Sequence, residues 1–288
     1  MRYNNDVRIG LSTPVVMQLP GAVSAWERDG GVDDIVGIAS AADELGFDYL
    51  TCPEHVVVPE ADAAGRGSVY WDPVATLAYL AARTSRIRLV TAVVVLGYHH
   101  PLALAKRYGT LDRLSGGRLV LGVGVGSLAA EFELLGAPFA DRGARADDAL
   151  RALRASLSTT RPSHAGEFYS YDAVVLDPCA VQPRVPIWVG GRTRRSLRRA
   201  IDLADGWIPF GLSASELETM LSSVELPSGF EMALACGPLD PLGAPDDTRR
   251  RLAAVSRLGA TSATCAVASD SPANYVDQLR ALRDLHPE

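Results

Sequence analysis

The sequence predicts an α/β fold of the (β/α)8 barrel type, in which eight parallel strands alternate with eight helices. Short apolar segments rich in β-branched residues alternate with segments of helical periodicity along the chain. No linker or change of composition interrupts this alternation, so we expect one domain over residues 1–288, with an excursion near 160–180. A doubly wound open sheet is the alternative arrangement.

Eight segments have the composition of buried strands. The most regular is 87–96, a nearly continuous β-branched run that is typical of a parallel strand covered on both faces. The predicted strands are 7–12, 49–53, 87–96, 118–125, 187–189, 206–210, 231–236 and 262–267. The segment 169–176 is also strand-like, and we place it in the excursion outside the main sheet.

The predicted helices begin at residues that favour helix N-termini. Asp72 precedes Pro73, Thr193 precedes an arginine-rich segment, and Ser213 or Ser215 caps a later helix. The main predicted helices are 32–45, one that begins at 73, 102–114, a short one within 126–142, 143–157, one after Thr193, one after 213 or 215, 246–258 and 272–285. The stretch 56–71 is predicted as a long functional loop.

The composition excludes several classes of protein. With 288 residues, of which 48% are hydrophobic and 22% charged, the chain can bury a large core. Its net charge of -6 argues against nucleic acid as a partner, and neither a signal segment nor a membrane span is evident. We therefore expect a cytoplasmic protein. The four cysteines lack C-x-x-C spacing, which predicts neither a zinc site nor a disulfide framework.

The stretch PIWVGGRTRRSLRRA, residues 186–200, has the strongest functional pattern. A strand ends at Gly190-Gly191, and a helix begins directly afterwards with Thr193 at its N-cap. Glycine permits a close approach of the backbone to a ligand, while the helix N-terminus attracts an anion such as phosphate. Five arginines within this stretch add positive charge. An ordinary loop followed by a solvated helix face is the alternative interpretation.

Other unusual residues also follow predicted strands, where barrel enzymes place their active sites. Gly122-x-Gly124-x-Gly126 lacks the spacing of a dinucleotide fingerprint, and its glycines either admit a flat ring or fit a crowded rim. His55, beside Glu54, could donate a hydrogen bond or move a proton. The adjacent His99 and His100 point to opposite sides of an extended segment, so a metal site is not expected.

Two blocks of the sequence stand out in combination. The first is RIRLVTAVVVLGYHHPLALAKRYGTLDRLSGGRLVLGVGVGS, followed by EFELLGAPFADRGAR, and the second is PIWVGG with RRAIDLADGW after it. Together they closely resemble the luciferase-like monooxygenase family. The resemblance is strongest to the branch that uses coenzyme F420, a 5-deazaflavin. It covers most of the chain from about 32 to 210, and the last third carries no specific motif.

The resemblance implies site residues at the ends of four strands. Glu54 and His55 match the acidic residue and histidine that face the deazaflavin ring, and they would be the catalytic pair. A non-proline cis peptide would lie between Ala92 and Val93, behind the ring. The residues implied in cofactor binding are His55, Thr91, Ala92, Val93, Gly124, Val125, Gly126, Gly190, Gly191, Arg192 and Thr193.

The activity implied by the resemblance is hydride transfer between the C5 carbon of F420 and a small organic substrate. Family members that act on sugar phosphates have a catalytic glutamate where this chain has Ser127, which argues against that substrate class. An FMN-dependent monooxygenase that uses oxygen and a non-catalytic flavin-binding barrel are the alternatives. Family members are commonly homodimers, and helices near 74–82 and 102–114 could form such an interface.

Overall fold

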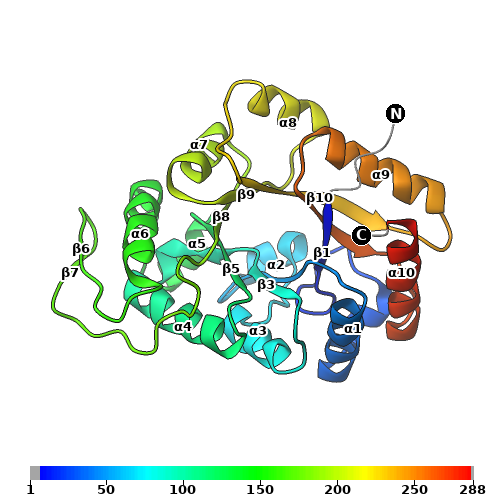
Figure 1. The fold of residues 1–288 in the computed structure, drawn as a ribbon, viewed down its shortest axis with the longest axis horizontal. Helices are drawn as coiled ribbons and strands as arrows, with labels where there is room; N and C mark the ends of the chain where they lie inside the picture. The colour runs from blue at the N-terminus through cyan, green and yellow to red at the C-terminus, as the bar shows by residue number, and fades with distance from the viewer. Residues whose placement is uncertain (1–6, 287–288) are drawn as a thin grey trace.

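The computed structural model describes residues 7–286, and it is a closed parallel β-barrel surrounded by helices (Figure 1). Residues 1–6 and 287–288, which the predicted domain includes, lie outside the described part. The strand order is β3-β2-β1-β11-β10-β9-β8-β5-β4, and pairing of β3 with β5 closes the ring. This closure confirms the predicted barrel and excludes the open sheet. Every pairing within the barrel is parallel.

The barrel strands agree with the predicted segments to within a few residues. They are β1 (Arg8–Ser12), β2 (Tyr49–Cys52), β3 (Arg88–Thr91) with β4 (Val94–Val95), β5 (Leu119–Gly124), β8 (Ile187–Gly190), β9 (Gly206–Ile208), β10 (Glu231–Leu239) and β11 (Ser262–Val267). The helices that alternate with them are α1 (Val32–Glu44), α3 (Pro73–Ala81), α4 (Pro101–Leu114), α6 (Arg142–Ser156), α7 (Arg194–Leu203), α8 (Ala214–Leu221), α9 (Pro245–Arg257) and α10 (Pro272–Leu285).

The third barrel position is interrupted, which corrects the prediction of one continuous strand over 87–96. The peptide between Ala92 and Val93 is cis, at the position that the family resemblance implied. Strand β3 ends before this peptide and β4 begins after it. The Thr91 hydroxyl donates a hydrogen bond to the Gly122 carbonyl oxygen at 2.6 Å, so this corner is bonded to the neighbouring strand β5.

Side-chain hydrogen bonds confirm the predicted helix caps at Asp72 and Thr193 and decide between the two candidates for α8. Asp72 accepts from the Ala75 N–H at 2.8 Å, and Thr193 accepts from the Ser196 N–H at 3.2 Å. Ser213, rather than Ser215, caps α8. Each cap satisfies a backbone donor that the first helical turn leaves without a partner.

Two segments differ from the sequence prediction. The stretch predicted as a long loop contains α2 (Glu60–Arg66), a helix in which no residue is buried. The predicted strand over 169–176 is mostly irregular, and only β7 (Ser170–Tyr171) pairs, with β6 (His164–Ala165). The Asp148 carboxylate holds this hairpin against α6 by accepting from His164 and the Phe168 N–H at 2.7 Å each.

The buried residues form two clusters, one inside the ring of strands and a larger one between strands and helices. The inner cluster contains Tyr49, Val90, Val120, Trp188 and Ala233, which come from different strands. Glycines make room for its two large rings, because a Cβ on Gly10 would lie 2.1 Å from Tyr49, and one on Gly206 would lie 2.6 Å from Trp188. The interior is therefore a packed core rather than a channel.

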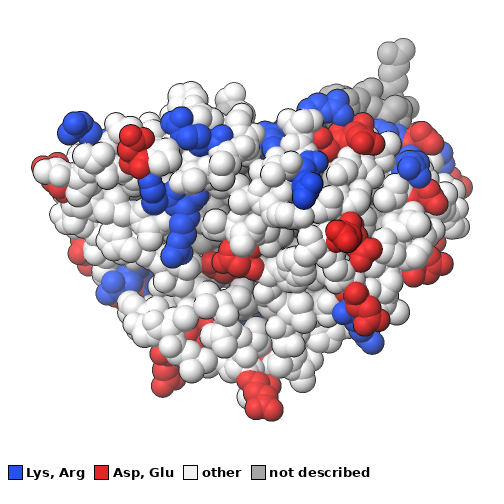
Figure 2. Space-filling model, turned by 90° about the horizontal axis from the view of Figure 1, so that it is seen from below, with Lys and Arg blue, Asp and Glu red and all other residues white. Residues whose placement is uncertain are grey.

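The surface carries charges of both signs. On the face shown in Figure 2, acidic and basic side chains are interspersed among uncharged residues. In the described part of the chain, no helix is long and apolar enough to cross a lipid bilayer.

Candidate active site

The residues predicted to form the site lie at the C-terminal ends of adjacent barrel strands. Glu54 and His55 follow β2, and the Ala92–Val93 peptide separates β3 from β4. Gly124 ends β5 and Gly190 ends β8. Because β2 pairs with β3, β4 with β5 and β5 with β8, these strand ends follow one another around one rim.

The side chain of Val93 explains two of the predicted glycines. A Cβ on Gly124 would lie 2.8 Å from Val93 Cγ2, and a Cβ on Gly190 would lie 2.7 Å from Val93 Cγ1. Neither distance is compatible with a real contact, so both positions need glycine to accommodate the valine. Val93, between β3 and β4, therefore lies against the glycines that end β5 and β8, and we call these three residues the Val93 ledge.

Glycine is needed at two further predicted positions for different reasons. Gly126 has a φ of +78°, and a Cβ there would lie 2.5 Å from the Phe132 ring. Gly191 has a φ of +150°, and its Cβ would meet Ser196 Cβ at 2.5 Å. Gly191 thereby lets the chain turn directly from β8 into the first turn of α7.

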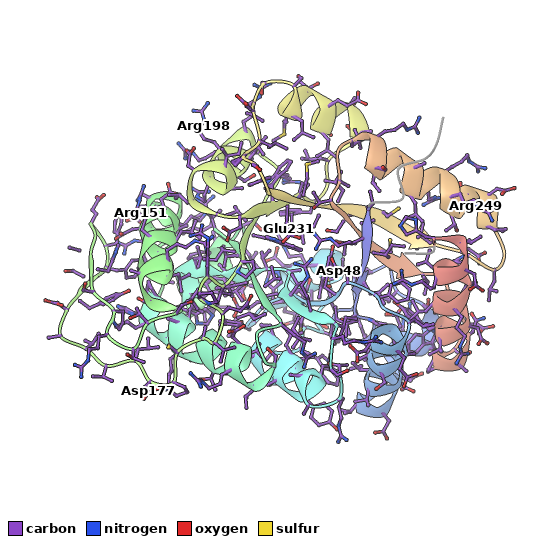
Figure 3. The ribbon with its side chains drawn as sticks, viewed as in Figure 1. Asp48, Arg151, Asp177, Arg198, Glu231 and Arg249 are labelled. Atoms are coloured by element: carbon purple, nitrogen blue, oxygen red, sulfur yellow. The ribbon has the colours of Figure 1, made fainter. Side chains whose placement is uncertain are left out.

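The N-terminus of α7 has the features of an anion site. Thr193 and Ser196 cap one another reciprocally, while the N–H groups of Arg194 and Arg195 have no hydrogen-bond partner among residues 7–286. Four arginines around this turn are exposed, namely Arg192, Arg194, Arg195 and Arg198. Arg198 lies at the periphery of the molecule in Figure 3.

The fifth arginine of this segment corrects the sequence interpretation. Arg199 is buried, forms an ion pair with Asp147 and donates to the Gly143 carbonyl oxygen at 3.1 Å. Its charge is therefore used to join α7 to α6 rather than to attract an anion.

Glu54 and His55 are adjacent in sequence but have different partners. Glu54 is buried, accepts from the Val95 N–H at 2.7 Å and lies 2.8 Å from His99 Nε2. His99 Nδ1 in turn lies 3.4 Å from an Arg107 nitrogen. Glu54 thus holds β4 and the short η2 helix (Leu96–Tyr98) in place, and its predicted catalytic role stays a prediction.

His55 is held by a carboxylate that the sequence analysis did not identify. Its Nδ1 lies 2.6 Å from Oε2 of Glu131, a fully buried residue of α5 (Ala129–Leu134). The Tyr70 and His55 rings pack in a T-shaped arrangement, with 4.5 Å between ring centroids. His55 Nε2 has no hydrogen-bond partner among the described residues.

Tyr98 belongs to the same group of side chains. Its hydroxyl donates to Glu131 Oε2 at 2.7 Å, and burial together with this hydrogen bond raises the pKa of Tyr98 well above its usual value. Nearby, burial raises the pKa of the Cys52 thiol to about 12, so this cysteine remains a protonated packing residue.

His99 and His100 have separate environments, as their adjacency predicted. His99 pairs with Glu54, whereas His100 caps α4 by accepting from the Leu102 N–H at 3.2 Å. The His100 ring packs against Tyr169, with 5.4 Å between centroids. Within the described residues, no three His, Cys, Asp or Glu side chains are grouped in a way that could hold a metal ion.

A cavity of 570 Å³ lies elsewhere, near the residues that precede β8, β9 and β10. Two of its arginines are already paired, because Arg154 and Arg184 both contact the Asp205 carboxylate. This cavity is at the opposite end of the strands from Gly124 and Gly190, so it is separate from the predicted site.

The profile of the luciferase-like monooxygenase family matches residues 13–226, which is more than half of the chain. This protein belongs to the luciferase-like monooxygenase family. An uncharacterised protein from Mycobacterium tuberculosis is 32% identical over 261 residues, covering 84% of this chain and 91% of that protein. The F420-dependent glucose-6-phosphate dehydrogenase of Nakamurella multipartita is 30% identical over 207 residues, which is 70% of this chain and 59% of that enzyme.

Solved structures share the luciferase-like fold over nearly the full chain. Monooxygenase RslO1 from Streptomyces bottropensis aligns with a TM-score of 0.75 at 21% identity, covering 96% of this chain and 98% of that one. An F420-dependent secondary alcohol dehydrogenase in complex with an F420-acetone adduct aligns at 0.72 and 14% identity, covering 98% and 99%. The FMN-bound oxygenating constituent of 3,6-diketocamphane monooxygenase from Pseudomonas putida aligns at 0.70 and 16%, covering 96% of each chain.

Proposed function

We propose that this luciferase-like protein is an F420-dependent oxidoreductase that transfers a hydride between the deazaflavin C5 and a small organic substrate. The observation that carries the proposal is the position of an arginine-rich helix N-terminus beside the Val93 ledge at one rim of the barrel. When bound, the deazaflavin would supply the hydride chemistry, while the protein would bind and orient both molecules.

The donors at α7 fit the anionic part of such a cofactor. The N–H groups of Arg194 and Arg195, which have no partner within the described part of the chain, and the positive end of the helix dipole favour a phosphate. The exposed guanidinium of Arg192 can add a charge-assisted hydrogen bond. The Thr193 hydroxyl accepts within the helix cap and keeps its own proton available for a further acceptor.

The Val93 ledge fits the flat ring. Since Gly124 and Gly190 have no side chains, nothing from these two positions projects beyond Val93, and a planar group can lie close to the backbone. Ala92 and Val93 are partly exposed at this position, so a ring lying there would cover apolar surface. His55 would then contact the ring or the substrate through Nε2.

A second candidate function is FMN-dependent monooxygenation. It is supported by the FMN-bound structure with the same fold, and FMN also carries a phosphate that would suit the α7 N-terminus. This neighbour is only 16% identical, so it supports the shared fold alone. The F420-dependent relative from Nakamurella multipartita is 30% identical, which favours F420 as the cofactor.

The experiment that tests the proposal is a pair of titrations of the purified protein, with F420 and with FMN, followed by fluorescence quenching and anisotropy. We expect micromolar binding of F420 and much weaker binding of FMN. Preference for FMN would overturn the proposed cofactor in favour of the monooxygenase, and binding of neither would favour a non-catalytic barrel. Reduced F420 that is bound but never reoxidised by any substrate in a broad screen would contradict hydride transfer.

A further inference from the structure

The Glu131 carboxylate receives four hydrogen bonds and is completely buried. Its Oε1 accepts from the N–H groups of Val56 and Val57, at 2.8 and 3.2 Å. Its Oε2 lies 2.6 Å from His55 Nδ1 and 2.7 Å from the Tyr98 hydroxyl. Backbone N–H groups can only donate, and Tyr98 is kept protonated by its raised pKa. Three donors therefore converge on one carboxyl group, which is the hydrogen-bonding pattern of an ionised carboxylate.

An ionised carboxylate accepts hydrogen bonds and cannot donate them, so His55 Nδ1 must carry the proton that it shares with Glu131. In a neutral imidazole the other nitrogen then has a free lone pair. His55 Nε2 has no partner within residues 7–286, and the His55 side chain retains 18% of its exposure. His55 Nε2 is therefore available to a bound molecule as a hydrogen-bond acceptor.

The neighbouring His99, which pairs with Glu54, differs from His55 in that neither of its ring nitrogens is free. Both His99 nitrogens are occupied, because Nε2 lies 2.8 Å from Glu54 and Nδ1 lies 3.4 Å from Arg107. His99 therefore has no ring nitrogen left for a ligand, although it is exposed to a similar extent, 16% against 18%. Of these two histidines, His55 is the one with an open ring nitrogen.

We infer that Glu131 is a positioning residue which fixes His55 as the Nδ1-protonated tautomer, so that Nε2 faces the bound molecule as a hydrogen-bond acceptor. The role of this tautomer in the reaction rests on the proposed function, in which His55 Nε2 would accept a hydrogen bond from the substrate or cofactor. Tyr98 and the two valine N–H groups keep the carboxylate charged and in place.

The test reads the tautomer directly, by long-range ¹H–¹⁵N correlation of the ring nitrogens in ¹⁵N-histidine-labelled, cofactor-free protein. Spectra are recorded at about pH 8, above the ordinary histidine pKa of about 6.5. The chain has five histidines, and the signals of His55 are assigned by their loss in His55→Asn. We expect a proton on Nδ1 and an unprotonated Nε2 for His55. A wild-type His55 with its proton on Nε2 would overturn the inference.

Glu131→Gln should move the proton without removing the buried group. Its carbonyl oxygen can still accept from the Val56 and Val57 N–H groups, which places the amide NH2 next to His55 Nδ1. We expect His55 Nδ1 to become the acceptor and the proton to shift to Nε2. Glu131→Asp, which remains an acceptor, should retain the wild-type tautomer. A folded Glu131→Gln protein with an unchanged tautomer contradicts the inference.

Two matched variants separate positioning from packing. Tyr98→Phe removes one donor to Glu131 but leaves the carboxylate, so His55 should keep its proton on Nδ1. Glu54→Gln should change the ring-nitrogen signals of His99 and leave those of His55 as they are. If Tyr98→Phe shifts the His55 tautomer as Glu131→Gln does, general repacking rather than Glu131 sets the tautomer, and the inference fails.

Failure of this inference can be distinguished from failure of the proposed function. A protein with the expected tautomer that binds no F420 leaves this inference intact and overturns the proposed cofactor.

Discussion

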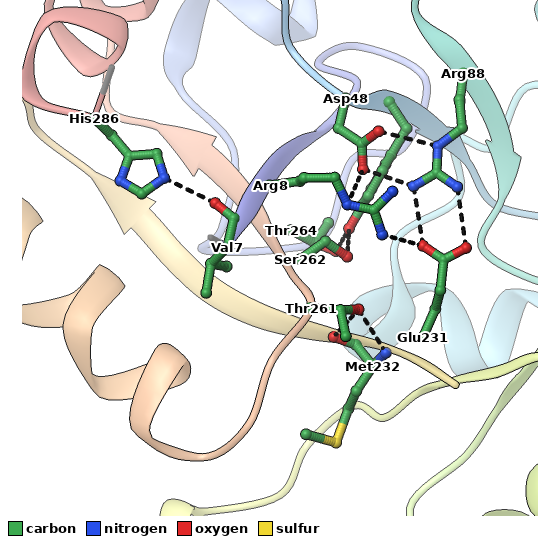
Figure 4. Close-up of polar contacts among 11 residues, drawn as sticks. Val7, Arg8, Asp48, Arg88, Glu231, Met232, Thr261, Ser262, Thr264 and His286 are labelled. Atoms are coloured by element: carbon green, nitrogen blue, oxygen red, sulfur yellow. Dashed lines mark hydrogen bonds and ion pairs between the residues drawn. The ribbon is translucent and has the colours of Figure 1, made fainter. Parts of the chain in front are cut away.

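The two ends of this barrel use charged residues in different ways. At the end where the strands begin, Arg8, Arg88, Asp48 and Glu231 pair with one another (Figure 4). At the end where they finish, His55 Nε2 and the first N–H groups of α7 have no partner among the described residues. Polar groups that satisfy one another stabilise the fold, whereas polar groups left open can bind a ligand.

The four residues at the beginning of the strands form a cluster over the inner core. Glu231 lies 3.2 Å from Arg88 Nη1 and also pairs with Arg8, while Asp48 lies 2.6 Å from Arg88 Nη2. The Arg88 guanidinium also lies over the Trp188 ring, 5.4 Å from its centroid. Asp48 and Glu231 lie near the middle of the ring of strands in Figure 3. The cluster therefore closes this end of the barrel.

The largest effect is expected for Glu231→Ala, which should lose stability. The change leaves Arg8 and Arg88 with one carboxylate between them, and removal of one partner from the mostly buried Arg88–Glu231 pair costs about 3 kcal/mol. Urea denaturation of the variant measures this loss. Glu218→Ala on the exposed surface of α8 is the control, for which we expect a change within about 0.5 kcal/mol. Equal stability of the two variants would show that the cluster does not hold this end together.

A smaller effect is expected at the opposite end, in Gly124→Ala. The new methyl group would lie 2.8 Å from Val93 Cγ2, and overpacking of this kind costs about 2 kcal/mol. Displacement of Val93 should also weaken F420 binding, measured by fluorescence titration. Gly37→Ala in α1 is the matched control, because nothing lies within 4 Å of its added Cβ.

The same position offers a test of the cause. Val93→Ala removes the methyl groups that a Cβ on residue 124 would meet, so the double variant Val93→Ala with Gly124→Ala should recover much of the stability lost by Gly124→Ala. Strictly additive effects would mean that the glycine is needed for a reason other than Val93.

The positions of the strands and helices could be predicted from the sequence because they depend on local features. These features are the periodicity of apolar residues and caps such as Asp72 and Thr193, and the structure confirms them. The short helix α2 was not predicted, because it buries no residue and so has no apolar periodicity. The break between β3 and β4 has no local signal either, and only the family resemblance indicated it.

In the site, motifs that are local in sequence were found and pairs that depend on tertiary structure were not. Gly190, Gly191 and Thr193 lie close together in the sequence, so the strand–glycine–helix pattern that they form can be recognised from the sequence alone. Glu131 is 76 residues from His55 and begins the segment EFELLGAPFADRGAR, which belongs to the family resemblance but was assigned no role in the site. Its role follows only from burial and from four converging donors, and neither property can be read from one sequence.

The groups at the N-terminus of α7 that have no partner in the described part of the chain should contribute to cofactor binding. Arg192→Ala should weaken F420 binding about tenfold, or ~1.4 kcal/mol, because an exposed guanidinium beside a phosphate contributes a charge-assisted hydrogen bond. Titration at two salt concentrations checks this, since the wild-type affinity should fall more steeply with salt. Arg249→Ala on α9, whose arginine pairs with Asp246 on the surface, is the control and should bind as the wild type does. A loss of affinity in both variants would point to net charge rather than to a site.

The smallest effect is on the acid dependence of stability. Burial raises the pKa of Glu231, but the ion pairs with Arg88 and Arg8 outweigh it and hold this pKa below its ordinary value of 4.5. A carboxyl group whose pKa is lowered by folding stabilises the protein above pH 4.5, and this stabilisation is lost as the pH falls through the folded-state value. Glu231→Gln lacks this titration, so its unfolding free energy should fall less steeply below pH 4.5 than that of the wild type, by at most one proton. Asp48 faces the same arginines and remains in both proteins, which makes the difference between the two curves specific to Glu231. Parallel curves in urea denaturation across this range would mean that the arginines do not hold Glu231 in its ionised form, and the closed end of the barrel would then depend on packing alone.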